Sequence, residues 1–270
     1  MKGALILLAH SFKRLRTLVL IMGTVLAVFQ IFLILIARSI ERSNTFDQMS
    51  ALIPPFVRQL MGPSFTSFMS FRGIVSLGYF HLAVMGSLIA LAIAIATMPA
   101  SEIEMGYMDL MLVRPIARHW VITRSIAMLL ICELFLFAMM MMGTWIGLNL
   151  LAQKIAAWPQ PDFILLLVLN LGLLLICWGG VALAIGARSR RRGMAGSITG
   201  LLALVTFLLD YVARAWQPAE AVAWLSPFKY FNPLELLMGR DIPPHNLWVL
   251  AGIGLAGFIL AYIFFSRRDI

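Results

Sequence analysis

The chain has 270 residues, of which 61% are hydrophobic and 12% are charged, and its formal net charge is +9. A soluble domain needs more polar residues to cover its surface, so this composition excludes an ordinary soluble protein and indicates an integral membrane protein. The basic residues stand at the ends of apolar runs rather than on one polar face. This placement argues against nucleic acid as a partner and favours membrane lipid.

Six apolar stretches are long enough to cross a bilayer as helices, since one span needs roughly 20 largely apolar residues. They are residues 17–37, 77–98, 121–148, 163–187, 194–213 and 247–265. The segments between them are too short for a separate soluble domain, so we expect one all-α membrane domain over residues 1–270. Before the first span, an apolar stripe opposite basic residues predicts an N-terminal helix lying in the membrane interface. The stripe consists of Leu5, Leu8, Phe12 and Leu15.

Clusters of basic residues predict the orientation of the chain in the membrane. They precede the first span and follow the fourth, at Lys2, Lys13, Arg14 and Arg16 and at Arg188, Arg190, Arg191 and Arg192. The positive-inside rule assigns both segments to the cytoplasm. Six spans then return the C-terminus, with Arg267 and Arg268, to the same side.

The interval from Pro99 to Arg124 is the most polar one between two long apolar runs. Ser101 followed by Glu104 has the spacing of a capping box, which predicts a helix that begins at Glu102. Pro115 disfavours helical geometry at the residue before it and ends the element. Its apolar face would comprise Ile103, Tyr107, Leu110 and Met111, and its polar face Glu102 and Asp109. We therefore expect a short amphipathic helix between the second and third spans.

Three of the polar residues within the predicted spans are candidates for a functional role. Glu133 is a third to half of the way across the third span, where an ionisable group is costly unless it faces a polar or hydrated interior. Two interpretations stay open: a functional intramembrane group, or a structural one that is protonated or hydrogen-bonded to a neighbouring helix. Asn170 and Gln30 are candidates for hydrogen bonds between helices, with lining of a conduit as the alternative. Together the three residues are the candidate translocation path.

Pairs of residues one helical turn apart predict specific contacts. Gly143 and Gly147 form one GxxxG pair, and Gly196 and Gly200 form another, and such pairs permit close approach of two helices. Asp210 lies one turn before Arg214, so these side chains are expected to form a local ion pair.

Motifs of catalysis and cofactor binding are missing from the sequence. It contains no GxxxxGK[ST] phosphate loop, no HExxH, no CxxC pair and no GxSxG. The chain is therefore not expected to be an enzyme, to hydrolyse nucleotide in the P-loop manner or to hold a metal or cofactor of its own.

The segment SEIEMGYMDLMLVRPIAR resembles the cytoplasmic segment between the second and third spans of ABC-2 type transporter permeases. The matching positions are Glu102 or Glu104, Gly106, Leu110–Leu112, Pro115 and Arg118, whereas Tyr107 departs from the small hydroxyl residue common after the glycine. The C-terminal FFSRRDI and the stretch SPFKYFNP, residues 226–233, are similar to further segments of that family. Six spans with an N-terminal interfacial helix extend the resemblance over nearly the whole chain.

The resemblance implies a permease subunit of a bacterial plasma-membrane exporter with both termini in the cytoplasm. Such a subunit dimerises with a second permease copy and docks on separate ATP-binding cassette ATPase subunits, which hold the ATP and Mg²⁺. The helix from Glu102 to Val113 would be the coupling helix. Its expected contacts with the ATPase are Glu102, Glu104, Gly106, Tyr107, Leu110, Met111, Pro115 and Arg118. The resemblance implies export but specifies no substrate. We expect a hydrophobic or amphipathic compound that moves along the dimer interface.

Two other functions remain compatible with the residues. A self-sufficient secondary transporter or channel would use Glu133 as its proton-coupling or pore group. A membrane-embedded enzyme would depend on Glu133 or on His81.

Overall fold

The computed structural model describes residues 2–42, 70–107, 119–153, 158–214 and 216–267, and within them it is helical and contains no strand. Six segments in these ranges are long and apolar enough to cross a membrane. They are Leu15–Glu41, Phe71–Ala96, His119–Leu151, Pro161–Arg188, Arg192–Ala213 and Pro244–Ser266. Each overlaps one of the six spans predicted from sequence, so the all-α class and the number of spans are confirmed for this part of the chain.

The first helix, α1 (Lys2–Arg42), is continuous over 41 residues. The residues of the predicted N-terminal helix are therefore helical but form no separate element, because they run into the first span without a break. Their location in the membrane interface stays a prediction. No proline interrupts this stretch, so nothing in the sequence forces one. At 1.5 Å per residue, α1 is about 60 Å long, roughly twice the thickness of the hydrocarbon core of a bilayer.

The second span consists of two helices, α4 (Phe71–Phe80) and α5 (Leu82–Ala96), which meet at His81. His81 has an extended ψ of 134°, and its Nδ1 accepts a hydrogen bond from the Ala83 N–H at 3.2 Å. Its ring also lies edge-on to Phe29 of α1, with centroids 5.9 Å apart. His81 thus caps α5 and packs against the neighbouring helix.

The helix α8 (His119–Leu151) packs along α1, and a glycine makes their close approach possible. A Cβ atom added at Gly143 would lie 2.5 Å from the backbone oxygen of Ala27. The first GxxxG pair therefore makes the contact that its spacing predicts. A Cβ added at Gly196 or Gly200 would meet nothing within 4 Å, so no helix of the described chain approaches the second pair.

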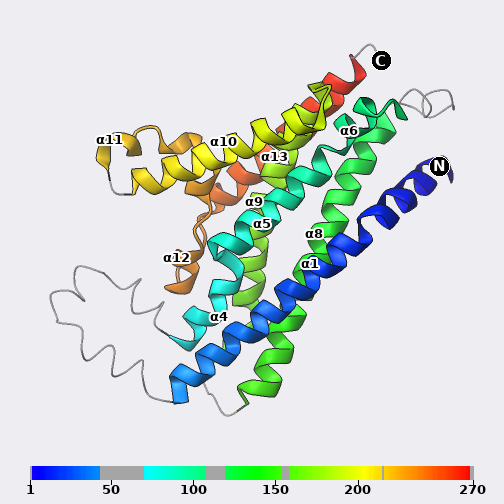
Figure 1. Cartoon of the computed structure of the whole chain (residues 1–270). Coiled ribbons are helices and arrows are strands. Elements are labelled where there is room, and N and C mark those ends of the chain that lie inside the picture. Colours follow the sequence, from blue (N-terminus) through cyan, green and yellow to red (C-terminus); the bar gives the residue numbers. More distant parts are fainter. Residues whose placement is uncertain (1, 43–69, 108–118, 154–157, 215, 268–270) are drawn as a thin grey trace.

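The most deeply buried span is α9 (Pro161–Arg188), which packs against α5 and α13 (Pro244–Ser266). Gly180 lies directly against the backbone of Gly254 and Gly257, so α9 and α13 touch through their main chains. The span α10 (Arg192–Ala213) is largely exposed and diverges from the bundle in Figure 1.

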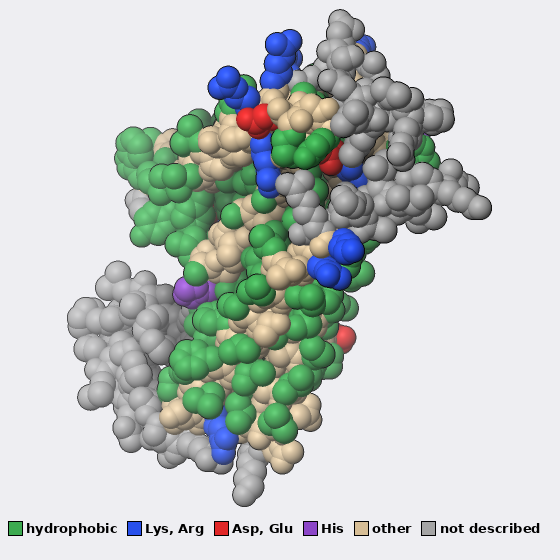
Figure 2. Space-filling view, turned by 45° about the vertical axis from the view of Figure 1, so that its right-hand side comes forward, with side chains coloured by type: hydrophobic (Ala, Val, Ile, Leu, Met, Phe, Trp, Pro, Cys, Tyr) green, Lys and Arg blue, Asp and Glu red, His purple; other side chains and the backbone are tan. Residues whose placement is uncertain are grey.

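Both chain termini lie toward the upper right of Figure 1, at the same end of the bundle as the short helix α6 (Met98–Glu104). We call this the terminal end. The opposite end carries α4 and the cap, a run of short helices between α10 and α13. The cap consists of α11 (Gln217–Glu220), η1 (Ala223–Leu225), η2 (Pro227–Tyr230) and α12 (Pro233–Leu237). Figure 2 shows hydrophobic side chains over most of one face and basic side chains mainly in its upper half.

Candidate functional site

The helix α6 is fixed to the third span by a buried ion pair. Arg124 Nη2 of α8 donates to Glu102 Oε2 at 2.6 Å, and the two side chains are 4% and 8% exposed. Arg124 lies in the second turn of α8, shortly before the long apolar part of that span. Because both charges are removed from solvent and satisfy one another, α6 cannot move away from α8 without exposing two unpaired charges.

The prediction of one helix from Glu102 to Val113 is wrong at its start. The helix α6 begins at Met98, with Pro99 in its first turn, where proline is well tolerated, so Ser101 lies inside the helix and forms no capping box. The helix also ends at Glu104, because Gly106 adopts a φ of +69° that helical residues avoid. Glu102 is consequently not on a solvent-facing side but buried against Arg124.

A second carboxylate of α6 contacts the fifth span. Glu104 Oε2 accepts a hydrogen bond from the backbone N–H of Arg192, the first residue of α10, at 2.9 Å. A negative charge at a helix N-terminus is stabilising because the free N–H groups there carry partial positive charge. Arg192 Nη2 also donates to the carbonyl of Ala94 in α5 at 3.1 Å. The bonds of Glu102 and Glu104 thus connect α6 to α8 and α10, and Arg192 in turn connects α10 to α5.

The residues that follow α6 are exposed at the terminal end, where Met105 and Gly106 form a turn and Tyr107 is again helical. Met105 is 43% and Tyr107 is 50% exposed, and a Cβ at Gly106 would meet nothing within 4 Å. The side chains of Met105 and Tyr107 are thus exposed next to a tight turn. The helix before this turn, α6, is fixed to α8 by the buried Glu102–Arg124 ion pair. We call residues 105–107 the α6 turn. The remaining predicted contacts, at Leu110, Met111, Pro115 and Arg118, lie outside the described residues.

The candidate path residues are all buried but lie on different helices. Gln30 on α1 and Asn170 on α9 are 0% exposed, and Glu133 on α8 is 7% exposed. Within the described chain, neither amide has a hydrogen-bond partner and Oε1 of Glu133 has none. The Gln30 amide packs against Gly78, next to Tyr79, whose hydroxyl pairs with Thr144 at 2.8 Å. No hydrogen bond joins any two of the three, so their role as one path stays a prediction.

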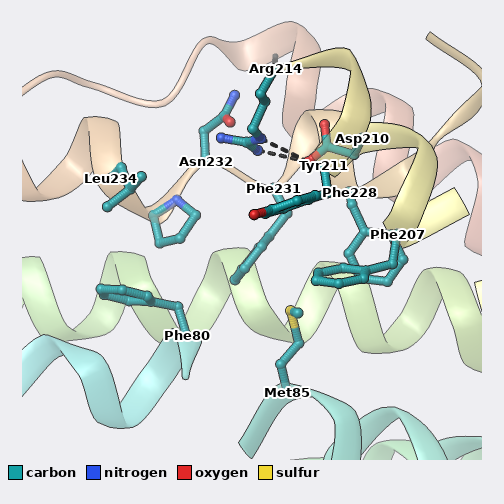
Figure 3. Close-up of a pocket in the computed structure, with 11 residues that line it drawn as sticks. Phe80, Met85, Phe207, Asp210, Tyr211, Arg214, Phe228, Phe231, Asn232 and Leu234 are labelled. Atoms are coloured by element: carbon teal, nitrogen blue, oxygen red, sulfur yellow. Dashed lines mark hydrogen bonds and ion pairs between the residues drawn. The ribbon is translucent and has the colours of Figure 1, made fainter. Parts of the chain in front are cut away.

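A cavity of about 290 Å³ lies at the cap end, between the junction of α4 and α5, the end of α10, and the cap (Figure 3). Its lower part is lined by apolar and aromatic side chains. These are Phe80, Met85, Phe207, Phe228, Phe231, Pro233 and Leu234. The cap is fixed over the cavity because Ser226 Oγ donates to the carbonyl of Thr206 at 2.8 Å and accepts from the N–H of Phe228 at 3.2 Å.

The opposite wall of this cavity is polar. Asp210 and Arg214 form the predicted ion pair, in which Nε and Nη2 of the arginine donate to Oδ2 at 3.0 and 2.8 Å. A second cavity of about 350 Å³ shares these two residues and Asn232, and it adds Glu220 and Lys229. The two cavities together join a charged region to an aromatic one. This combination suits a molecule that has both a polar and an apolar part.

The sequence did not identify Arg124 or Arg192 as partners of α6. Both bonds join residues far apart in the chain, 22 positions in one case and 88 in the other. The only available signal was that a basic residue, Arg124, lies one turn into the third span, while two acidic residues, Glu102 and Glu104, follow the second span. The cap cavity carried no sequence signal beyond the aromatic and proline-rich composition of residues 216–246.

Neither the known protein-family models nor the curated proteins give a match to this chain. Its class therefore follows from the structure alone. The six apolar helices fit a multi-pass α-helical membrane protein.

Proposed function

We propose that the chain is the permease subunit of an ABC-2 type ATP-driven transporter in a bacterial plasma membrane. The observation that supports this most is the α6 turn, an exposed surface backed by the buried Glu102–Arg124 ion pair. A partner that presses on the turn moves α6, and α6 then moves α8 through the ion pair and α10 through Glu104. This arrangement can transmit force into two spans.

The partner in this proposal is a separate ATP-binding subunit, which supplies the ATP, the Mg²⁺ and the hydrolysis. The chain itself has no phosphate loop, so its own contribution is binding and movement. A second permease copy, identical or related, completes the transporter. The basic residues at the terminal end favour a cytoplasmic location for that end, where ATP is available.

The substrate in this proposal is hydrophobic or amphipathic and is exported. The cap cavities support this substrate class because their charged region, with Asp210, Arg214 and Lys229, adjoins an aromatic one. Glu133, Asn170 and Gln30 remain candidates for the path between the two ends.

The proposal is tested with two glycines in matching backbone settings. Gly106 and Gly239 both have positive φ, of 69° and 76°, and both donate their N–H to the carbonyl three residues earlier. Proline cannot adopt a positive φ, and it has no backbone N–H to donate. The tagged chain purified from its native membrane should carry a stoichiometric ATP-binding subunit, which Gly106→Pro loses and Gly239→Pro retains. Absence of any ATP-binding subunit from the unmodified chain would refute the proposal.

A second candidate function is a secondary transporter that works without ATP. The observation that favours it is the buried Oε1 of Glu133, which has no partner in the described chain and would be available for proton coupling. Purified protein in proteoliposomes would then transport in response to a proton gradient alone, and Glu133→Gln would abolish this transport. Under the first proposal, Glu133→Gln leaves ATPase association intact.

A further inference from the structure

A groove between α9, α10 and α13 opens at the terminal end and contains a cavity of about 850 Å³. Its walls are almost entirely apolar, with Ile185 from α9, Ile198 from α10 and Ala256 and Phe264 from α13. This volume lies within the range of about 300–1,000 Å³ that small-molecule sites occupy in proteins. None of the contacts at the α6 turn or in the cap involves this groove.

Two arginines stand at the mouth of the groove. Arg188 is the last residue of α9, Arg190 follows it in the short turn to α10, and both side chains are exposed. The guanidinium carbon of Arg188 lies 5.9 Å from the centroid of the Phe264 ring, which holds this charge over the apolar wall. Among the described residues, neither arginine forms an ion pair, and no carboxylate lines the cavity.

We propose that this groove binds an anionic phospholipid of the surrounding membrane. The lipid phosphate lies between Arg188 and Arg190, and one acyl chain follows the apolar walls past Ile198 and Ala256. Guanidinium groups bind phosphate oxygens in pairs of parallel hydrogen bonds, and basic pockets between spans are suited to lipid headgroups. A zwitterionic lipid gains less, because the lining residues include no carboxylate to receive its ammonium group.

The site depends on the arginines and not on the nearby start of α10. The first N–H of that helix, on Arg192, is already bonded to Glu104, which does not line the cavity. The inference also does not require an ATP-binding partner. It needs only that the chain lies in a membrane, so it can hold or fail independently of the proposed transport function.

The test measures lipid retention by the purified full-length protein with native mass spectrometry. Phosphatidylglycerol and phosphatidylcholine with identical acyl chains are added in separate titrations. The variants are Arg188→Gln/Arg190→Gln, Arg190→Gln alone, Ala256→Phe, and Arg191→Gln as the matched control. Arg191 is exposed in the same turn but does not line the cavity. Arg191→Gln therefore removes the same charge as Arg190→Gln but leaves the proposed site intact.

The unmodified protein is expected to retain phosphatidylglycerol more tightly than phosphatidylcholine. The double variant should weaken phosphatidylglycerol binding about 30-fold and phosphatidylcholine binding by a smaller factor, because both lipids carry the phosphate but only phosphatidylglycerol has a net negative charge. Arg190→Gln alone should weaken phosphatidylglycerol binding about fivefold. Ala256→Phe, which fills the chain-binding part, should weaken retention of both lipids, and Arg191→Gln should change neither.

Three results would overturn the inference. Equal retention of the two lipids by the unmodified protein would show that the arginines do not select a headgroup. An equal loss with Arg191→Gln and Arg190→Gln would indicate diffuse surface charge instead of a site. Unchanged binding in Ala256→Phe would show that the acyl chain does not enter the cavity. Because Arg190 and Ala256 are both exposed, these single variants remain informative if the double variant fails to fold.

Discussion

The ion pair between Glu102 and Arg124 holds α6 to α8, and replacing either partner tests how much it contributes. The side chains are 8% and 4% exposed and 2.6 Å apart. Removing one charge leaves the other buried without a partner, which costs about 3–5 kcal/mol, whereas an exposed pair contributes about 0–1 kcal/mol. We therefore expect Glu102→Leu or Arg124→Met to lower the free energy of unfolding by about 3–5 kcal/mol.

The double variant distinguishes a buried pair from two independent residues. With both charges removed, no unpaired charge remains, so Glu102→Leu/Arg124→Met should be more stable than either single variant. The coupling energy from the cycle should reach about 3 kcal/mol, the upper end of the usual range for residues in contact.

The assay is unfolding in detergent micelles with increasing mole fractions of SDS, followed by tryptophan fluorescence. Glu104→Gln is the control, because glutamine keeps an acceptor for the N–H of Arg192 and should cost less than about 1 kcal/mol. The reasoning is refuted if each single variant costs less than about 1 kcal/mol, or if the double variant costs the sum of the two.

The remaining predictions concern packing within the bundle. Gly143→Ala should destabilise the protein by about 1–3 kcal/mol, because the new Cβ meets the backbone of Ala27, whereas Gly196→Ala should be neutral or slightly stabilising. The same SDS titration measures both, and equal effects would contradict the packing of α1 on α8. Tyr79→Phe should cost about 1 kcal/mol through loss of its hydrogen bond to Thr144, and no change in unfolding would mean that this bond does not contribute to the stability of the protein in micelles.

The spans were predictable from sequence because a bilayer imposes a length and a composition on each helix. The first GxxxG pair and the Asp210–Arg214 pair were predictable because both rest on local spacing along one helix. The second GxxxG pair, at Gly196 and Gly200, carries the same spacing but faces open space within the chain. A GxxxG spacing indicates that another helix can approach closely, but whether one does depends on the tertiary arrangement.

The sequence predicted that a short helix lies between the second and third spans, but it did not predict where α6 begins and ends or what it contacts. Ser101 and Glu104 match a capping box, yet Pro99 starts the helix earlier, and the positive φ of Gly106 ends it. Two local signals conflicted here, and the helix follows Pro99 and Gly106 and not the capping-box spacing. The ion pair of Glu102 could not be foreseen because its partner belongs to another helix.

The most direct test of the proposed function is site-specific photocrosslinking from Tyr107 in the α6 turn, with Trp248 as the control position. Tyr107 is 50% exposed at the terminal end, and Trp248 is 76% exposed near the start of α13, at the cap end. In native membranes, a photoreactive residue at 107 is expected to crosslink to an ATP-binding subunit identified by mass spectrometry, and one at 248 is not. Crosslinks to an ATP-binding subunit from neither position, or equally from both, would contradict the account.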